Sequence, residues 1–303
     1  MKRKGELRLT KHHGAGNDFL VLLDPDDRRP LSPAEVRILC DRRRGIGADG
    51  LIRAMNGRAG AVVTMDLRNA DGSPAEMSGN GIRCLVQAAV DARWVAPGPV
   101  PVATPTGIRT VVYRAGDRPG LGFASVDMGP ATLGPEWTSD RLPPELSLGL
   151  RHARTVSMGN PHVVLFGTEV DDATVRSVGA RLEASVEGRA NVEFVWPATE
   201  SDTLTMRVWE RGVGETLACG TGTCAVAAAA ASWGLVGSVV RVHNPGGTLE
   251  VELGDDGITL SGPTQKVADI VVDADTMTTL LTTETELAPV SVTAARQGVA
   301  SGP

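Results

Sequence analysis

Short apolar runs alternate with polar positions along most of the chain, and a few longer runs repeat with helical spacing. The short runs are rich in β-branched and aliphatic residues, a pattern typical of strands with one buried face. They predict strands at residues 7–10, 19–23, 61–67, 108–113, 123–128, 163–166, 191–195, 204–209, 238–242 and 248–253.

Three segments predict helices. The first begins with the capping box Ser32-Pro33-Ala34-Glu35, which has proline at the first helical position, and runs to about residue 41. The others cover residues 82–94 and 221–233. The last is so rich in alanine that a solvated face is excluded, and we expect a central helix packed on all sides. We expect Arg42-Arg43-Arg44 to be a solvated helix end.

The chain contains an internal repeat. Gly16-Asn17-Asp18-Phe19 resembles Gly159-Asn160-Pro161-His162, and Asn160 lies 143 positions after Asn17. The sequence SGNG at 78–81 resembles CGTG at 219–222, and Cys219 lies 141 positions after Ser78. Two motif pairs at nearly the same spacing predict two copies of one α/β unit.

The repeat also predicts the domain organisation. We expect an N-terminal half over 1–127, completed by a strand from 264–274, and a C-terminal half over 128–263. From about residue 275 the chain is rich in Thr, Ala and Ser without clear periodicity. The segment 275–303 is therefore expected to be a disordered or loosely helical tail.

Composition excludes several classes of protein. The 303 residues are 42% hydrophobic and 22% charged. The sequence has no apolar run of 18 or more residues, the length needed to span a membrane. A net charge of −6 and ten aromatic residues provide neither a basic surface nor stacking platforms, so nucleic acid is not expected as a partner. No apolar segment of a secretory signal follows the basic N-terminus, so we expect a cytoplasmic protein with its four cysteines as thiols.

No cofactor or metal is expected. The chain has only four lysines, three of them within the first 11 residues, which disfavours a pyridoxal phosphate enzyme. The cysteines and histidines lack the paired spacing of zinc ligands. The Gly45-x-Gly47-x-x-Gly50 motif neither follows a clear strand nor opens a helix, so a dinucleotide site is not expected.

The repeated motifs predict an anion site. Ser78 and Cys219 each precede a Gly-x-Gly turn that opens a helix, where free backbone amides and the helix dipole favour an anion. If a pseudo-twofold axis relates the halves, both helices point at one small anion, such as a carboxylate. The same position predicts that the pKa of Cys219 lies below its reference of about 8.5. The alternative is two structural glycine turns with a buried cysteine.

Seven segments between residue 11 and about 247 resemble the diaminopimelate epimerase family. They are HHGAGNDFLVL, DRRRGIGADGL, RNADGSPAEMSGNGIRC, SMGNPHVV, NVEFV, ERGVGETLACGTGTCA and NPGG. The resemblance implies an α/β (α+β) fold with two pseudo-symmetric domains, each a mostly antiparallel curved sheet or barrel around a central helix. It also implies a cofactor-independent epimerase that interconverts LL- and meso-diaminopimelate in lysine and cell-wall synthesis, and a homodimer.

In that family two cysteines face the substrate α-carbon from opposite sides. One matches Cys219, whereas the other falls on Ser78. An alcohol is a much weaker acid than a thiol, so proton transfer should be slowed in both directions. Three explanations for Ser78 remain open: an introduced Cys→Ser change, a natural serine in a working enzyme, or a relative with altered or lost activity.

The resemblance implies roles for the other matched residues. Glu210 and His162 would assist the acid–base pair. The distal end of the substrate would be held by Asn17, Asn69, Asn160, Asn191 and Arg211, whose guanidinium suits a carboxylate. The backbone amides that would receive the reacting carboxylate are those of Gly79, Asn80, Gly220 and Thr221.

Each of these residues also has a structural interpretation. The asparagines could cap turns, His162 could be a buried strand-end histidine, and Glu210-Arg211 could be an ordinary surface ion pair. Because the distal set is intact, diaminopimelate is the expected substrate. The alternatives are a racemase or epimerase of another amino acid on the same fold, and a catalytically inactive relative that binds an amino acid.

Overall fold

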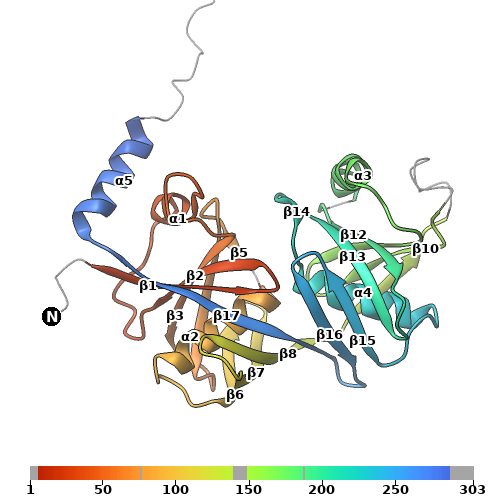
Figure 1. Cartoon of the computed structure of the whole chain (residues 1–303), viewed down its shortest axis with the longest axis horizontal. Helices are drawn as coiled ribbons and strands as arrows, with labels where there is room; N and C mark the ends of the chain where they lie inside the picture. The colour runs from red at the N-terminus through yellow and green to blue at the C-terminus, as the bar shows by residue number, and fades with distance from the viewer. Residues whose placement is uncertain (1–5, 76, 139–148, 187, 287–303) are drawn as a thin grey trace, which may run out of the picture.

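The computed structural model describes residues 6–75, 77–138, 149–186 and 188–286. Figure 1 shows two halves side by side, each with one helix surrounded by strands. The elements of the N-terminal half, in chain order, are β1 (Leu7–Gly14), β2 (Asn17–Leu23), α1 (Pro33–Cys40), β3 (Gly50–Asn56), β4 (Val63–Asn69), β5 (Pro74–Ala75), α2 (Gly79–Asp91), β6 (Gly98–Thr104), β7 (Gly107–Ala115) and β8 (Leu121–Gly129).

The second half repeats this order after a short strand, β9 (Thr132–Glu136). Its elements are β10 (His152–Ser157), β11 (Pro161–Phe166), α3 (Asp172–Ser185), β12 (Asn191–Pro197), β13 (Thr203–Glu210), β14 (Gly214–Thr216), α4 (Gly220–Ser232), β15 (Val239–Asn244), β16 (Gly247–Leu253) and β17 (Ile258–Val272). A last helix, α5 (Ala274–Glu286), follows β17.

Strand pairing confirms the predicted duplication. In the first half β2 pairs in parallel with β3, and β4 pairs in parallel with β6, while the other neighbours are antiparallel. The second half has the same pattern, with parallel pairs β11–β12 and β13–β15. Two copies of one α+β unit therefore make up the fold.

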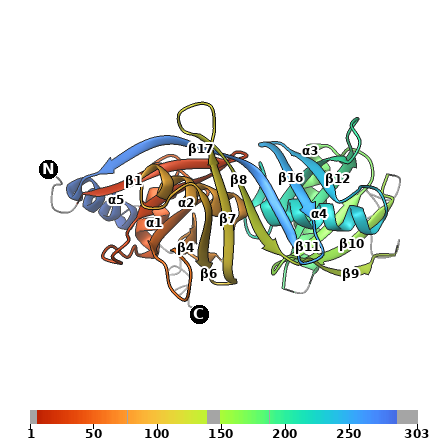
Figure 2. The same ribbon diagram turned by 90° about the horizontal axis from the view of Figure 1, so that it is seen from below.

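The two copies share their closing strands. β17 pairs with β8 over most of that strand and then with β1, which closes an eight-stranded barrel around α2. After β8 the chain enters β9, which pairs with β10 in the other half. Figure 2 shows β17 running across both halves beside β8. The expected boundaries at 127/128 and 263/264 thus fall within two continuous strands.

The central helices are the core of each half. Nearly every residue of α4 is buried, and its alanines let the strands pack closely around it, as the sequence predicts. Cys84 in α2 and Cys224 in α4 are fully buried. The capping box at the start of α1 is present, with Ser32 and Glu35 each bonded to the other's backbone amide.

Some elements are missing from the sequence prediction. Helix α3 was not predicted, because its exposed positions interrupt the apolar spacing, although Asp171 caps it by accepting from Thr174. Strand β6 contains Pro99 and Pro101, which obscure its strand pattern.

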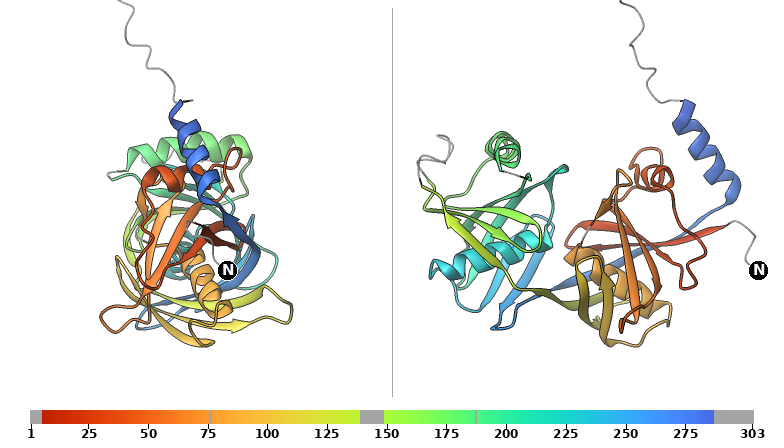
Figure 3. Two further views of the ribbon diagram at one scale, coloured as in Figure 1. Left: turned by 90° about the vertical axis from the view of Figure 1, so that its left-hand side faces the viewer. Right: turned by 180° about the vertical axis from the view of Figure 1, so that it is seen from behind.

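Helix α5 occupies the first part of the expected tail. Figure 3 shows it beyond the end of β17. It lies beside α1, and its Met277 joins the apolar cluster that contains Leu39. Residues 287–303 lie outside the described part of the chain. No helix in the described ranges is long and apolar enough to cross a membrane.

Candidate active site between the two halves

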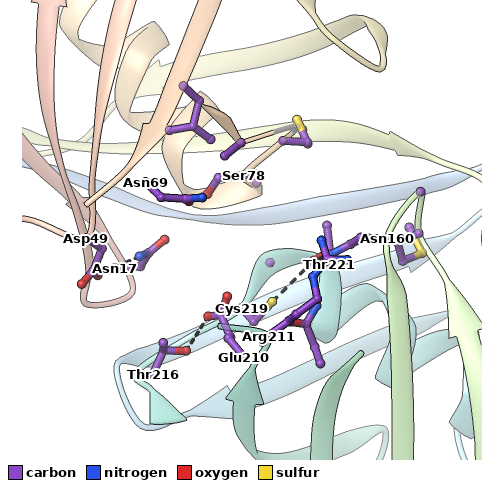
Figure 4. Close-up of a pocket in the computed structure, with 18 of the residues that line it drawn as sticks. Asn17, Asp49, Asn69, Ser78, Asn160, Glu210, Arg211, Thr216, Cys219 and Thr221 are labelled. Atoms are coloured by element: carbon purple, nitrogen blue, oxygen red, sulfur yellow. Dashed lines mark hydrogen bonds between the residues drawn. The ribbon is translucent and has the colours of Figure 1, made fainter. Parts of the chain in front are cut away.

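A cavity of about 270 Å³ lies between the halves and is lined by residues from both. In Figure 4, Ser78 and Asn69 lie on one wall, and Cys219 and Glu210 lie on the other. The lining contains eleven of the thirteen expected site residues: Asn17, Asn69, Ser78, Gly79, Asn160, Asn191, Glu210, Arg211, Cys219, Gly220 and Thr221. The other two, Asn80 and His162, are buried and contact residues of this lining.

The helices α2 and α4 meet at the cavity through their N-termini. Ser78 caps α2, since its Oγ accepts from the Gly81 amide at 3.0 Å, and Cys219 caps α4, since its Sγ accepts from the Gly222 amide at 3.3 Å. A Cβ on Gly220 would lie 3.2 Å from the Gly79 Cα. Glycine therefore permits the close approach of two positive helix ends, which together favour a bound anion.

The thiol of Cys219 does not have the lowered pKa that its helix position predicts. Burial raises its pKa well above the ordinary value, and the negative charges of Glu210 and Glu193 raise it further. Hydrogen bonds from Thr221 and from the Gly222 amide act in the opposite direction. The prediction was wrong because the sequence shows neither the burial of this sulfur nor the two carboxylates from neighbouring strands that face it.

Glu210 is suited to proton transfer near neutral pH. Burial raises the pKa of Glu210, and a hydrogen bond from Thr216 lowers it. Burial is the larger effect, so the resulting pKa is about 7. The Thr216 hydroxyl donates to Glu210 Oε1 from the neighbouring strand β14. Because an acid–base group works best when its pKa lies near the working pH, Glu210 can exchange a proton in this cavity. Sequence reasoning missed Thr216.

His162 is fully buried and held at both ring nitrogens. Its Nδ1 lies 2.6 Å from Glu193 Oε1, and its Nε2 lies 3.1 Å from Asn160 Oδ1. Glu193 was not among the expected site residues. A charged residue inside the apolar run NVEFV was the available signal, because a buried carboxylate requires a partner.

A polar network supports the opposite wall. Asn17 Nδ2 donates to Asp49 Oδ2 at 2.8 Å, and Arg42 donates to Asp49 Oδ1 at 2.7 Å. Asn80 Nδ2 lies 3.3 Å from both Asn17 Oδ1 and the Ala218 carbonyl, so it connects the halves. Arg42 is thus an ion-pair partner and not simply part of a solvated helix end, because the fold brings Asp49 beside it.

The residues expected at the distal end surround the same cavity. The Arg211 amide donates to Asn191 Oδ1 at 2.8 Å, which places Arg211 at the mouth of the site. Its exposed guanidinium has one long contact, 3.4 Å from Nη1 to the Gly188 carbonyl. Asn69 Nδ2 donates to Ser73 Oγ at 3.0 Å. The guanidinium of Arg211 is therefore available to bind a carboxylate through two parallel hydrogen bonds.

The lining also contains five residues that were not among the expected site residues: Met77, Thr106, Arg109, Met128 and Met158. The Arg109 guanidinium has a buried Nε with no hydrogen-bond partner within the described ranges. In the same part of the chain, no group of three or more His, Cys, Asp or Glu side chains is arranged to hold a metal ion.

Comparison with known proteins identifies the family. The diaminopimelate epimerase family model matches residues 9–134 and 154–267. A diaminopimelate epimerase from Synechocystis sp. is 40% identical over 276 residues, covering 86% of this chain and 97% of the relative. One from Desulforudis audaxviator is 41% identical over 277 residues, covering 87% and 98%.

Solved structures share the fold. A hydroxyproline epimerase from Agrobacterium vitis has a TM-score of 0.68 at 16% identity, covering 91% of this chain and 94% of its own. A phenazine biosynthesis protein of the PhzF family from Bacillus anthracis has a TM-score of 0.66 at 14% identity, covering 90% and 99%. With the matches in sequence, these findings confirm the resemblance, and the chain belongs to the diaminopimelate epimerase family.

Proposed function

We propose that this protein is an isomerase that interconverts LL- and meso-diaminopimelate in lysine and peptidoglycan synthesis. The observation that carries the proposal is the meeting of two helix N-termini at one cavity, with Ser78 and Cys219 at the two cap positions. A substrate α-carbon bound between them has one of these side chains on each face. Epimerisation needs this arrangement, because the proton leaves from one face and returns to the other.

The helix ends would bind the reacting carboxylate. The backbone amides of Gly79, Asn80, Gly220 and Thr221 lie in the first turns of the two helices. As the α-proton leaves, negative charge spreads onto the carboxylate, and preorganised amides stabilise that charge more strongly than the ground state. The electrostatics of the helix ends therefore lower the barrier to proton removal.

Proton transfer would use Cys219 on one face and Ser78 on the other. In one direction the Cys219 thiolate removes the α-proton and the Ser78 hydroxyl delivers a proton, and the reverse reaction retraces the same steps. Glu210 and His162 would assist by exchanging the Cys219 proton and balancing its charge. Because the serine hydroxyl is a poor acid, turnover should be slow in both directions.

The distal end of the substrate would lie against the remaining polar lining. The Arg211 fork suits a carboxylate, and the amide side chains of Asn17, Asn69, Asn160 and Asn191 can bind both the carboxylate and the ammonium. This set distinguishes a substrate with an amino-acid group at each end from a simple amino acid.

We also propose that the protein acts in the cytoplasm and forms a homodimer. Light scattering tests the homodimer by measuring the molar mass in solution.

Ser78 favours a second candidate. A relative in which proton delivery is lost could bind an amino acid without turnover, or could act on another amino acid. The choice between a natural and an introduced serine does not alter the chemistry that this side chain can perform.

Chiral chromatography of reaction mixtures tests the proposal. The protein and its Ser78→Cys variant are incubated separately with LL-diaminopimelate, with L-lysine and with L-proline. Formation of meso-diaminopimelate without racemisation of lysine or proline supports the proposed function. Racemisation of lysine or proline instead indicates another substrate, and no conversion by either form indicates a binding role.

A further inference from the structure

A chain of polar contacts leads from Glu193 in β12 to Cys219 at the start of α4. Glu193 Oε1 lies 2.6 Å from His162 Nδ1, and His162 Nε2 lies 3.1 Å from Asn160 Oδ1. Asn160 Nδ2 lies 3.3 Å from Thr221 Oγ1, which lies 3.4 Å from Cys219 Sγ. Figure 4 shows the last of these contacts beside the cavity. The chain therefore ends on the sulfur that faces the substrate site.

Glu193 is placed where its charge is stabilised. The side chain is fully buried, and a Cβ on Gly222 would lie 2.7 Å from its Oε1, so it packs against the first turn of α4. The positive end of a helix favours an anion at this position. Within the described ranges, the Glu193 Oε2 atom has no hydrogen-bond partner, so His162 is the hydrogen-bond partner of this carboxylate. A buried negative charge is stabilised most by a positively charged partner, so this pairing favours a protonated His162 ring.

The orientation of each group gives the chain a direction. An ionised Glu193 can only accept, so His162 Nδ1 donates to it. Asn160 turns its carbonyl oxygen toward His162 and its amide nitrogen toward Thr221. This arrangement is satisfied when His162 Nε2 also carries a proton, because Asn160 then accepts from the ring and donates to Thr221. The Thr221 hydroxyl is left free to donate to Cys219.

A neutral His162 ring that carries its proton on Nδ1, as donation to an ionised Glu193 requires, would reverse the chain. Its Nε2 lone pair would face the Asn160 carbonyl oxygen, so the amide would have to turn over and donate to the ring. The Thr221 hydroxyl would then donate to Asn160, and Cys219 would lose this donor. The protonation of His162 is thereby coupled to the hydrogen bonding of Cys219 Sγ.

We propose that Glu193 is a positioning residue that keeps His162 in the imidazolium form, so that every donor in the chain points toward Cys219 and stabilises its thiolate. The proposal deepens the proposed function, in which that thiolate removes the α-proton. The carboxylate charges near the sulfur act in the opposite direction: Glu210 on β13 and Glu193 itself each raise the pKa of Cys219, and Asp49 in the opposite half raises the pKa of Glu210. An imidazolium at His162 offsets the charge of Glu193, so the pair acts on the sulfur through the direction of the donors.

Two variants separate the links of the chain. Glu193→Gln removes the carboxylate that holds the imidazolium, and Thr221→Val removes the last donor without changing any charge. Thr221→Ser keeps the hydroxyl and is the matched control for the second variant. Asp24→Asn is the control for Glu193→Gln. It removes a different buried carboxylate, which pairs with Arg53 away from the cavity, and so shows the general effect of losing a buried charge.

Ring-nitrogen NMR and cysteine alkylation provide the readouts, and neither needs turnover. The protein has five histidines, and His162→Gln assigns the His162 signal in protein labelled with ¹⁵N at histidine. At pH 7 we expect both ring nitrogens of His162 to be protonated in the parent protein and in Thr221→Val, and one to be deprotonated in Glu193→Gln. Alkylation of Cys219 by iodoacetamide, followed by peptide mass spectrometry, should slow by about tenfold in Thr221→Val, as one pKa unit implies. Thr221→Ser, which keeps the hydroxyl, should be alkylated faster than Thr221→Val, and Asp24→Asn should match the parent.

Some results would overturn the proposal. A neutral His162 ring in the parent protein contradicts the imidazolium, and unchanged Cys219 alkylation in Thr221→Val contradicts the direction of the chain. If Glu193→Gln does not fold, the difference between Thr221→Val and Thr221→Ser still decides the second point. If the NMR and alkylation results are as expected but the protein does not convert diaminopimelate, the proposed function is rejected and this inference stands.

Discussion

The two halves of the molecule share a scaffold but differ in the chemistry that they carry. Both present a helix N-terminus to the cavity, capped by Ser78 in one half and Cys219 in the other. At four equivalent positions around these caps, the N-terminal half has no ionisable side chain, whereas the C-terminal half has three. The pairs are Phe19 and His162, Gly50 and Asn191, Ile52 and Glu193, and Asn69 and Glu210.

The strand register supports this equivalence, since Phe19 pairs with Gly50 as His162 pairs with Asn191. The duplication therefore retained the part of the site that needs symmetry. One carboxylate can be held by two helix ends only if both copies keep their glycine turns. Titratable groups are instead concentrated around Cys219, so the two faces of a bound α-carbon meet very different acid–base environments.

The largest expected effect comes from removing the sulfur. Cys219→Ala should reduce α-proton exchange by about 10²–10⁴-fold, the usual contribution of a positioned acid–base group. Deuterium incorporation into diaminopimelate measures the effect. The matched control is Cys224→Ala, which removes a buried thiol one turn further along α4 and should retain exchange. Full activity of Cys219→Ala would show that the C-terminal half does not supply the base.

Adding a methyl group to either glycine turn tests whether the two helix ends are equally constrained. Gly220→Ala should cost about 1–3 kcal/mol of folding stability, because its Cβ would lie 3.1 Å from a Leu260 methyl group and 3.2 Å from the Gly79 Cα, and backbone cannot move as a side chain can. Gly79→Ala should cost less, because its nearest obstacle is a movable methyl group of Leu260, 2.8 Å away. Urea unfolding measures both. Equal costs would contradict the close approach of the helices at Gly220.

Replacing the guanidinium of Arg211 tests the distal end of the site. Arg211→Lys should weaken binding of diaminopimelate by about tenfold and leave binding of alanine nearly unchanged, because a lysine cannot donate in a planar, bidentate manner. Calorimetric titration compares the two ligands. The control is Arg189→Lys, which alters an arginine that pairs with Glu183. Parallel losses for both ligands would remove Arg211 from the distal site.

The pH dependence of stability tests the burial of Glu210. Its pKa is raised from 4.5 to about 7 by burial, so between these values the folded protein binds a proton that the unfolded chain does not. Stability from this group is therefore complete below pH 4.5 and is lost as the pH rises through about 7. In urea unfolding at pH 5 and pH 8, the parent protein should lose more stability than Glu210→Gln. An identical change in both would contradict the raised pKa.

Much of the fold and of the site lining could be predicted because the signals are local. The glycine turns after Ser78 and Cys219, the alanine-rich helix and the offset between the copies are all visible along the chain. The sequence analysis assigned a strand from 264–274 to the N-terminal half, where β17 pairs with β1. It did not show that this strand also pairs with β16 and β8, because strand pairing over more than a hundred residues leaves no local pattern. Strand β6 was hidden by Pro99 and Pro101.

The electrostatics of the site could not be predicted from local sequence. Glu193, Glu210 and Cys219 come from three different elements, and their mutual effect on pKa depends on burial and on the distances between them. Thr216 and Asp49 are similar cases, since each contacts a site residue across strands. The helix position of Cys219 alone therefore gave the wrong direction for its pKa.

The most direct measurement is proton NMR of LL- and meso-diaminopimelate in D₂O with the parent protein and with Ser78→Cys. The account predicts slow loss of the α-proton signal with formation of the other epimer in the parent protein, and a rate at least about tenfold higher in Ser78→Cys, because a thiol is the better acid on that face. Loss of the signal no faster with Ser78→Cys, or no exchange by either form, would contradict the claim that the two cap residues exchange the α-proton.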